Sequence, residues 1–190
     1  MMRKVLTLVL LASMPVIHGC AAVALGGAAA TAGYVVGEDR RTVGTIAEDQ
    51  AIESKTGGRA TDKYPDAHLN VTSYNRMTLL TGEVPTAEAK ADIERIARAV
   101  ENVRGVYNEL RVGPPSALSQ RTNDAYITSK VKARFLDAQR FNPVYVKVVT
   151  EAGTVFLMGL VTHKEAEDAT ELARTTSGVQ KVVRVFEYTD

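Results

Sequence analysis

The sequence predicts an α+β fold that consists of two copies of one α-β-β-α-β unit. The first observation behind this prediction is an internal repeat, because residues 70–84 match residues 147–161 at one spacing without a gap. The second is the pattern within each copy, where apolar residues alternate as they do in half-buried strands. The third is a glycine and proline cluster at residues 113–116, which disfavours both helix and central strand and separates the copies.

Four aligned positions carry the repeat. They pair Val71 with Val148, Leu80 with Leu157, Gly82 with Gly159, and Val84 with Val161. Residues 75–76 and 152–153 lie between the paired strands, which predicts that each sheet contains a hairpin. We interpret Gly82 and Gly159 as strand positions where a crossing helix or a bulge approaches the backbone, not as functional glycines.

The first copy should begin with a helix near Glu48, which the glycine pair at 57–58 would keep short or frayed. A hairpin is expected over about 67–84. A second helix should then turn five apolar residues toward the sheet: Ala89, Ile93, Ile96, Ala97 and Val100. A third strand is expected over 103–112.

The second copy should follow the same order. Its first helix is expected over 124–138, with Thr122 or Asn123 as the cap. Four residues of this helix fall within about 80° of one another and should face the core: Ile127, Val131, Phe135 and Ala138. A second helix should turn four small residues inward: Ala166, Ala169, Thr170 and Ala173. The last strand should pass through Val179, Val182 and Phe186.

These elements divide the chain into five segments. They are a signal peptide at 1–19, a tether at 20–47, a first domain at 48–112, a linker at 113–120 and a second domain at 121–190. In each domain, a three-stranded sheet should be covered on one face by two helices. Two domains of this size will each have a modest core.

The start of the chain predicts a bacterial signal peptide. A positive n-region and a short apolar stretch at residues 5–16 precede the single cysteine, Cys20, and the stretch is too short to span a membrane. A cysteine at this place resembles the bacterial lipobox, which predicts acyl chains on Cys20. Because Ala21 follows the cysteine rather than Asp, we expect anchorage at the periplasmic face of the outer membrane. The alternative is a secreted protein with an unmodified cysteine.

Residues 21–37 are nearly all Ala, Gly and Val, and four glycines interrupt them. The stretch is short for a membrane span, and glycine is a poor helix former. We interpret it as part of a tether between Cys20 and the first domain. The alternative is a helix inserted into the membrane.

The composition argues against several classes of protein. A net charge of +1 and an aromatic content of 6% do not fit a dedicated nucleic-acid binder. A single cysteine excludes an internal disulfide and a thiolate metal cluster. The three histidines, His18, His68 and His163, have no carboxylate or second histidine at ligand spacing. No phosphate loop or nucleophile motif is present, so we expect no enzyme activity, no cofactor and no metal site.

Five short segments give the chain a family resemblance. They are residues 70–72, 106–109, 123–124, 127–128 and 155–162. With two α-β-β-α-β units behind a lipobox, they resemble the BON domains (bacterial osmoregulation and nodulation) over essentially the whole chain. The resemblance implies binding of anionic phospholipids, such as phosphatidylglycerol and cardiolipin, through the second domain. It also implies support of outer-membrane integrity at division sites.

The first helix of the second copy carries the candidate binding surface. Its apolar side chains are larger than those at the matched positions of the first copy, since Tyr126 aligns with Ala51. The candidate phospholipid-binding residues are Tyr126, Ser129, Lys130, Lys132, Ala133, Arg134 and Leu136. An aromatic residue and a leucine beside three cations fit a helix that lies against an anionic membrane. The alternative is that Tyr126 and Leu136 pack on the other domain or are ordinary surface residues.

A second function, in a different class, stays open. Small domains of this kind have exposed sheet edges that can accept a strand from a partner. The alternative is therefore a periplasmic protein adaptor that docks on the β-barrel assembly machinery, to which the resemblance also implies a connection.

Overall fold

The computed structural model describes residues 39–190, which form one unit. The predicted signal peptide, the predicted acylation site Cys20 and the predicted tether up to residue 38 lie outside the described residues. Within the described part of the chain, no helix is both long and apolar enough to cross a membrane.

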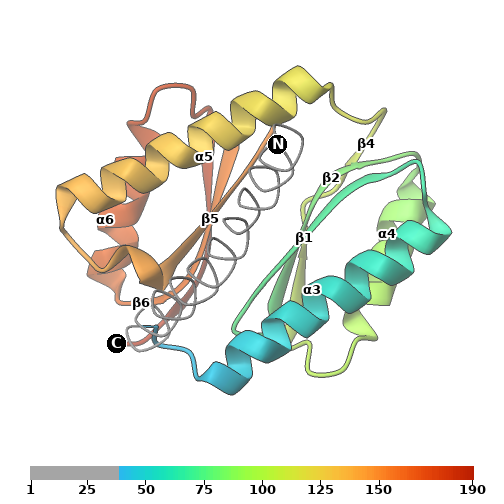
Figure 1. Cartoon of the computed structure of the whole chain (residues 1–190), viewed down its shortest axis with the longest axis horizontal. Coiled ribbons are helices and arrows are strands. Elements are labelled where there is room, and N and C mark those ends of the chain that lie inside the picture. The colour runs from blue at the N-terminus through green and yellow to red at the C-terminus, as the bar shows by residue number, and fades with distance from the viewer. Residues whose placement is uncertain (1–38) are drawn as a thin grey trace, which may run out of the picture. The chain divides into compact units, whose positions relative to one another are not determined.

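The order α-β-β-α-β occurs twice, as predicted (Figure 1). The first domain comprises α3 (Val43–Lys63), β1 (His68–Tyr74), β2 (Met77–Val84), α4 (Ala87–Arg98), β3 (Gly105–Asn108) and β4 (Arg111–Val112). The second comprises α5 (Leu118–Ala138), the 3₁₀ turn η1 (Pro143–Tyr145), β5 (Val146–Glu151), β6 (Thr154–Val161), α6 (His163–Arg174) and β7 (Lys181–Tyr188). The third strand of the first domain, expected over 103–112, is split into β3 and β4.

Each domain has a sheet with the same topology. The middle strand, β2 or β6, pairs antiparallel with the strand before it and parallel with the strand that follows the crossover helix. The two hairpins turn at residues 75–76 and 152–153, all four of which have positive φ values between 48° and 72°. Two successive residues of this conformation are typical of a type I′ turn, which confirms the predicted hairpins.

The two glycines at the matched strand position are explained by a neighbouring backbone. A Cβ atom on Gly82 would lie 1.9 Å from the carbonyl oxygen of His68, and one on Gly159 would lie 2.4 Å from that of Tyr145. The predicted close approach is confirmed, but the approaching backbone is the start of β1 for Gly82 and the end of the 3₁₀ turn η1, directly before β5, for Gly159, and in neither case a crossing helix.

Helix α3 corrects the expectation of a short first helix that begins near Glu48. The helix begins at Val43, where Oγ1 of Thr42 accepts a hydrogen bond from the Thr45 amide, and it continues through the glycine pair at 57–58 for a total of 21 residues. A Cβ atom on either glycine would meet nothing within 4 Å. Packing of the buried face therefore outweighs a propensity cost of about 1 kcal/mol per glycine.

Helix α5 also begins earlier than expected, at Leu118 rather than Asp124, and it too has 21 residues. At its start, the side-chain oxygen of Gln120 accepts a hydrogen bond from the Ala117 amide. This turn satisfies one of the free donors that every helix start leaves. Residues 118–120, expected in the linker, are therefore helical.

The helices cover one face of each sheet, and the expected core residues lie there. The first core contains Ala60, Leu80, Val84, Ala89, Ile93, Ala97 and Leu110. The second contains, among others, Ile127, Val131, Phe135, Val155, Leu157, Val161, Ala166, Ala169 and Ala173. Three residues expected to point inward, Ile96, Ala138 and Thr170, are only half-buried.

A third core joins the two domains and was not expected from the sequence. It unites Tyr74 and Leu79 of the first domain with Phe156, Met158 and Val185 of the second. Because Val155 and Leu157 lie in the other core of the second domain, β6 is buried on both faces. The faces of the sheets that carry no helices thus pack on each other, and the interface is apolar at its centre.

Polar contacts surround this third core. The Lys147 ammonium lies 2.7 Å from the Glu53 carboxylate, and the Asn75 amide nitrogen donates to Glu187 at 2.9 Å. The Tyr74 hydroxyl donates to the Tyr145 carbonyl at 3.2 Å. The interface therefore combines apolar burial with specific bonds that fix its register.

Candidate functional site

Helix α5 presents two different sides. Its buried side consists of Asp124, Ile127, Val131 and Phe135, and the Phe135 ring meets Phe141 edge to face at a centroid distance of 5.1 Å. This confirms the predicted core face of the helix. The opposite side faces solvent.

Large apolar side chains stand on the solvent side. Tyr126 and Leu136 are each 63% exposed, and the smaller candidate residues Ser129 and Ala133 are exposed between them. The alternative in which Tyr126 and Leu136 pack on the other domain is therefore excluded for the described residues. These side chains are available to a surface outside this unit.

A third residue of this surface, Leu118, is 78% exposed and was not expected from the sequence. Leu118 and Leu136 are 18 residues apart, and 18 residues make five full helical turns, so both lie on the same side of α5 about 27 Å apart. The residue escaped notice because the helix was expected to start at Asp124. We call Leu118, Tyr126 and Leu136 the α5 strip.

The three candidate cations differ in their surroundings. Lys132 is exposed, whereas the Lys130 ammonium donates to the Ser177 carbonyl and lies 4.6 Å from the centroid of the Tyr126 ring. Arg134 donates from one nitrogen to the Leu172 carbonyl at 2.9 Å, at the end of α6. Lys130 and Arg134 thus tie α5 to the end of α6 as well as adding positive charge beside the strip.

Two buried carboxylates, also missed, connect each first helix to its hairpin. Asp49 accepts hydrogen bonds from the Asn75 and Arg76 amides at 2.9 and 2.7 Å, and Asp124 accepts from those of residues 152 and 153 at 2.9 and 2.8 Å. Both occupy the same place in the repeat, 75 residues apart. The match between the two aspartates was visible when the two copies were aligned, but their hydrogen bonds to the hairpin amides were not.

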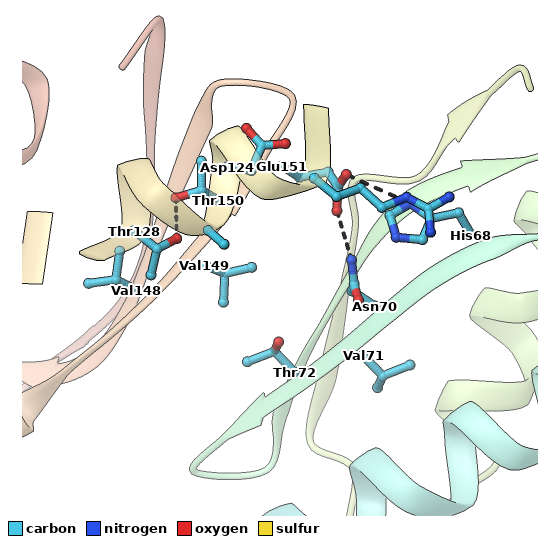
Figure 2. Close-up of a pocket in the computed structure, with 12 residues that line it drawn as sticks. His68, Asn70, Val71, Thr72, Asp124, Thr128, Val148, Val149, Thr150 and Glu151 are labelled. Atoms are coloured by element: carbon cyan, nitrogen blue, oxygen red, sulfur yellow. Dashed lines mark hydrogen bonds and ion pairs between the residues drawn. The ribbon is translucent and has the colours of Figure 1, made fainter. Parts of the chain in front are cut away.

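A groove of about 530 Å³ runs between the domains (Figure 2). It is lined by the edge strands β1 and β5 and by one side of α5, and it holds polar groups from both domains. The Asn70 amide donates to Glu151 at 2.9 Å, and the Thr128 hydroxyl donates to that of Thr150 at 2.7 Å. One edge strand of each sheet, β1 in the first domain and β5 in the second, thus lies along this groove.

Comparison with known proteins identifies the repeat. The family model described as "BON domain" matches residues 48–114 and 123–190. Outer membrane lipoprotein DolP of Haemophilus influenzae is 38% identical over 186 residues, which cover 96% of this chain and 95% of that protein. The 21 kDa hemolysin of Actinobacillus pleuropneumoniae is 34% identical over 79% of each chain. Osmotically-inducible protein Y of Escherichia coli is 28% identical over 80% of this chain and 78% of that protein.

The two family matches coincide with the two α-β-β-α-β units seen in the structure. The similarity to DolP extends over nearly the full length of both proteins. Neither the family nor this relative is enzymatic, which confirms that prediction. The chain therefore belongs to the BON-domain family and carries two BON domains in tandem.

Proposed function

We propose that this protein is an outer-membrane lipoprotein that binds anionic phospholipid through the α5 strip and thereby supports envelope integrity at division sites. The observation that carries the proposal is the solvent exposure of Leu118, Tyr126 and Leu136 on one helix. Apolar side chains that are exposed to water are unfavourable, and contact of this surface with a membrane would remove most of that cost.

Magnitudes indicate why apolar and charged groups are both needed. Each cation near an anionic membrane contributes about 1 kcal/mol, before screening by salt. Partial insertion of an apolar side chain adds roughly 1 kcal/mol, because full burial is worth about 1.5–3 kcal/mol. Neither contribution alone gives firm binding, whereas the strip and its neighbouring lysines together would.

The lipid anchor belongs to the same proposal. It is supported by the lipobox-like sequence at Cys20 and by the DolP relative, which is an outer membrane lipoprotein. Acyl chains would hold the protein at the membrane, and α5 would then select anionic lipid within it. Labelling with an alkynyl fatty acid should tag the wild type but not Cys20→Ala, and equal labelling of both would refute acylation at this residue.

Vesicle flotation tests the binding surface. A chain that begins at residue 21 should float with phosphatidylglycerol or cardiolipin vesicles and remain unbound with phosphatidylcholine vesicles. Tyr126→Ala should weaken binding about 3- to 10-fold, in keeping with the loss of about 1 kcal/mol. Tyr107→Ala is the matched control, since Tyr107 is an exposed tyrosine of the first domain and is 41% exposed.

The same vesicle experiment can also favour the alternative function, a protein adaptor that docks on the β-barrel assembly machinery. If Tyr126→Ala and Leu118→Ala stay folded by circular dichroism and bind anionic vesicles like the wild type, the α5 strip is not the lipid-binding surface. In that case, crosslinking from the sheet edges to a subunit of the β-barrel assembly machinery would support the adaptor function.

A further inference from the structure

The structure brings together a histidine and two glutamates that are far apart in the sequence. Nδ1 of His68 on β1 lies 3.0 Å from Oε2 of Glu83 on β2 and 3.9 Å from Oε1 of Glu151 on β5. One atom from each residue lies within 4.8 Å of the other two. Figure 2 shows His68 and Glu151 facing each other across the groove between the two domains.

Burial makes this cluster chemically unusual. The side chains of His68, Glu83 and Glu151 are only 14%, 5% and 7% exposed. Buried carboxylates need positive charge close by. Glu83 has the guanidinium of Arg111, whereas the only basic side chain in ion-pair range of Glu151 among the described residues is the His68 imidazole, at 3.9 Å. Among the described residues, Glu151 therefore has no lysine or arginine in ion-pair range.

The distances match a metal site. Zinc in a tetrahedral site has ligands at about 2.0–2.2 Å, which places ligand atoms roughly 3.3–3.6 Å from one another. The two observed separations, 3.0 and 3.9 Å, lie on either side of this value. The Ser116 hydroxyl is 3.4 Å from Nδ1 of His68, so a hydroxyl or a water from the groove could complete the coordination.

Neighbouring groups already orient the three ligands. The Asn70 amide holds Oε2 of Glu151 at 2.9 Å, which leaves Oε1 directed toward His68. The backbone amide of Ser116 donates to Glu83 at 3.0 Å, on the oxygen that faces His68. Hydrogen bonds of this kind fix the orientation of ligands in metal sites.

We propose that His68, Glu83 and Glu151 bind a divalent transition-metal ion across the interface between the two BON domains, with zinc as the best fit. An imidazole nitrogen with carboxylate oxygens suits Zn²⁺ and its first-row neighbours better than Mg²⁺ or Ca²⁺, which favour all-oxygen sites. The groove beside His68 and Glu151 provides a path of entry. Because β1 and β2 belong to one domain and β5 to the other, the ion crosslinks the two domains.

Zinc titration of the full-length protein in detergent tests the site, with Co²⁺ as a coloured substitute. The wild type should bind one Zn²⁺ per chain, should unfold at a higher temperature with Zn²⁺ than with EDTA, and should give a visible Co²⁺ spectrum of tetrahedral type. His68→Ala and Glu151→Gln should each weaken Zn²⁺ binding by at least about tenfold. Glu151→Gln preserves side-chain size, so it separates loss of a ligand from loss of fold.

The matched control is His163→Ala. His163 is the other histidine of the described residues, and it lies 2.9 Å from a single, exposed carboxylate, that of Asp190. If the ion is bound by His68, Glu83 and Glu151, His163→Ala should bind Zn²⁺ as tightly as the wild type. The proposal is overturned if the wild type binds no Zn²⁺ at micromolar concentration, if Glu151→Gln binds it as tightly as the wild type, or if only His163→Ala abolishes binding.

Discussion

The two BON domains bury the same positions of their first helix and expose different ones. Helix α3 buries Asp49, Ile52, Thr56 and Ala60, and α5 buries Asp124, Ile127, Val131 and Phe135, each 75 residues further along the chain. On the outer side, Ala51 and Thr61 of α3 correspond to Tyr126 and Leu136 of α5. At these two positions only the second copy has large apolar side chains, whereas Leu118, the third residue of the α5 strip, corresponds to Val43 of α3, which is also apolar and exposed.

Under the proposed function, the outer face of α5 binds lipid while its inner face, like that of α3, is fixed by folding. The glycine pair of α3 at 57–58 corresponds to Lys132 and Ala133 of α5. If α5 meets an anionic membrane as proposed, a cation at this position contributes to binding, whereas glycine contributes nothing. Four experiments test this separation between scaffold and surface.

The largest expected effect concerns the shared scaffold. Asp49→Ala removes the acceptor of two hairpin amides, of the Ser73 hydroxyl at 2.7 Å and of the Arg41 guanidinium at 2.9 Å. Breaking such a buried pair should lower the free energy of unfolding by about 3–5 kcal/mol.

In the second domain, Asp124→Ala should cost less, about 2–3 kcal/mol, because the acceptors of only two amides are lost. Urea unfolding of both variants measures the difference. No cost for either variant would show that the buried aspartates are not the element that the domains share, and equal costs would show that the contacts of Asp49 with Ser73 and Arg41 add no stability.

A smaller effect should come from making α3 resemble α5. The Thr56 hydroxyl is buried and has no hydrogen-bond partner within the described residues, and Val131 occupies the matched position in α5. Thr56→Val should therefore raise the free energy of unfolding by roughly 1 kcal/mol. The reverse change, Val131→Thr, should destabilise by a similar amount. Destabilisation by Thr56→Val in thermal unfolding would contradict this account of the inner face.

The smallest effects should appear in the pH dependence of stability, with opposite signs in the two domains. Burial would raise the pKa of Glu83, but hydrogen bonds from Ser116, His68 and Arg111 outweigh it and lower the pKa. Glu83 thus contributes stability above its unfolded pKa of about 4.3, and this is lost as the pH falls through the lower folded value. Glu83→Gln should therefore be more harmful at pH 7 than at pH 3.

For Glu151 the sign is reversed. Burial raises its pKa, so the folded protein binds this proton more tightly than the unfolded chain does. The resulting stability is present below the unfolded pKa and is lost as the pH rises through the raised folded value. Relative to the wild type, Glu151→Gln should gain stability between pH 4 and pH 7 when measured in EDTA. If the difference in the free energy of unfolding between Glu151→Gln and the wild type stayed constant with pH, the raised pKa assigned to Glu151 would be contradicted.

The sequence was sufficient for the repeated unit, the hairpins and the core faces, because those follow from periodicity and turn residues. It failed at the helix starts, since tertiary packing carries α3 past two glycines that propensity alone would not tolerate. It also missed the core between the domains, although the unbroken apolar run 155–161 is typical of a strand buried on both faces. The contact of His68 with Glu83 and Glu151 joins three separate strands, so no local spacing could predict it.

Tryptophan fluorescence can compare the outer faces of α3 and α5 directly, because the chain contains no tryptophan of its own. Tyr126→Trp places a unique fluorophore on the outer face of α5, and Ala51→Trp places one at the matched position of α3. With phosphatidylglycerol vesicles, we expect the emission of Tyr126→Trp to shift to shorter wavelength and to be quenched by brominated acyl chains, while that of Ala51→Trp stays unchanged. Equal responses from the two variants, or none from Tyr126→Trp, would contradict the account.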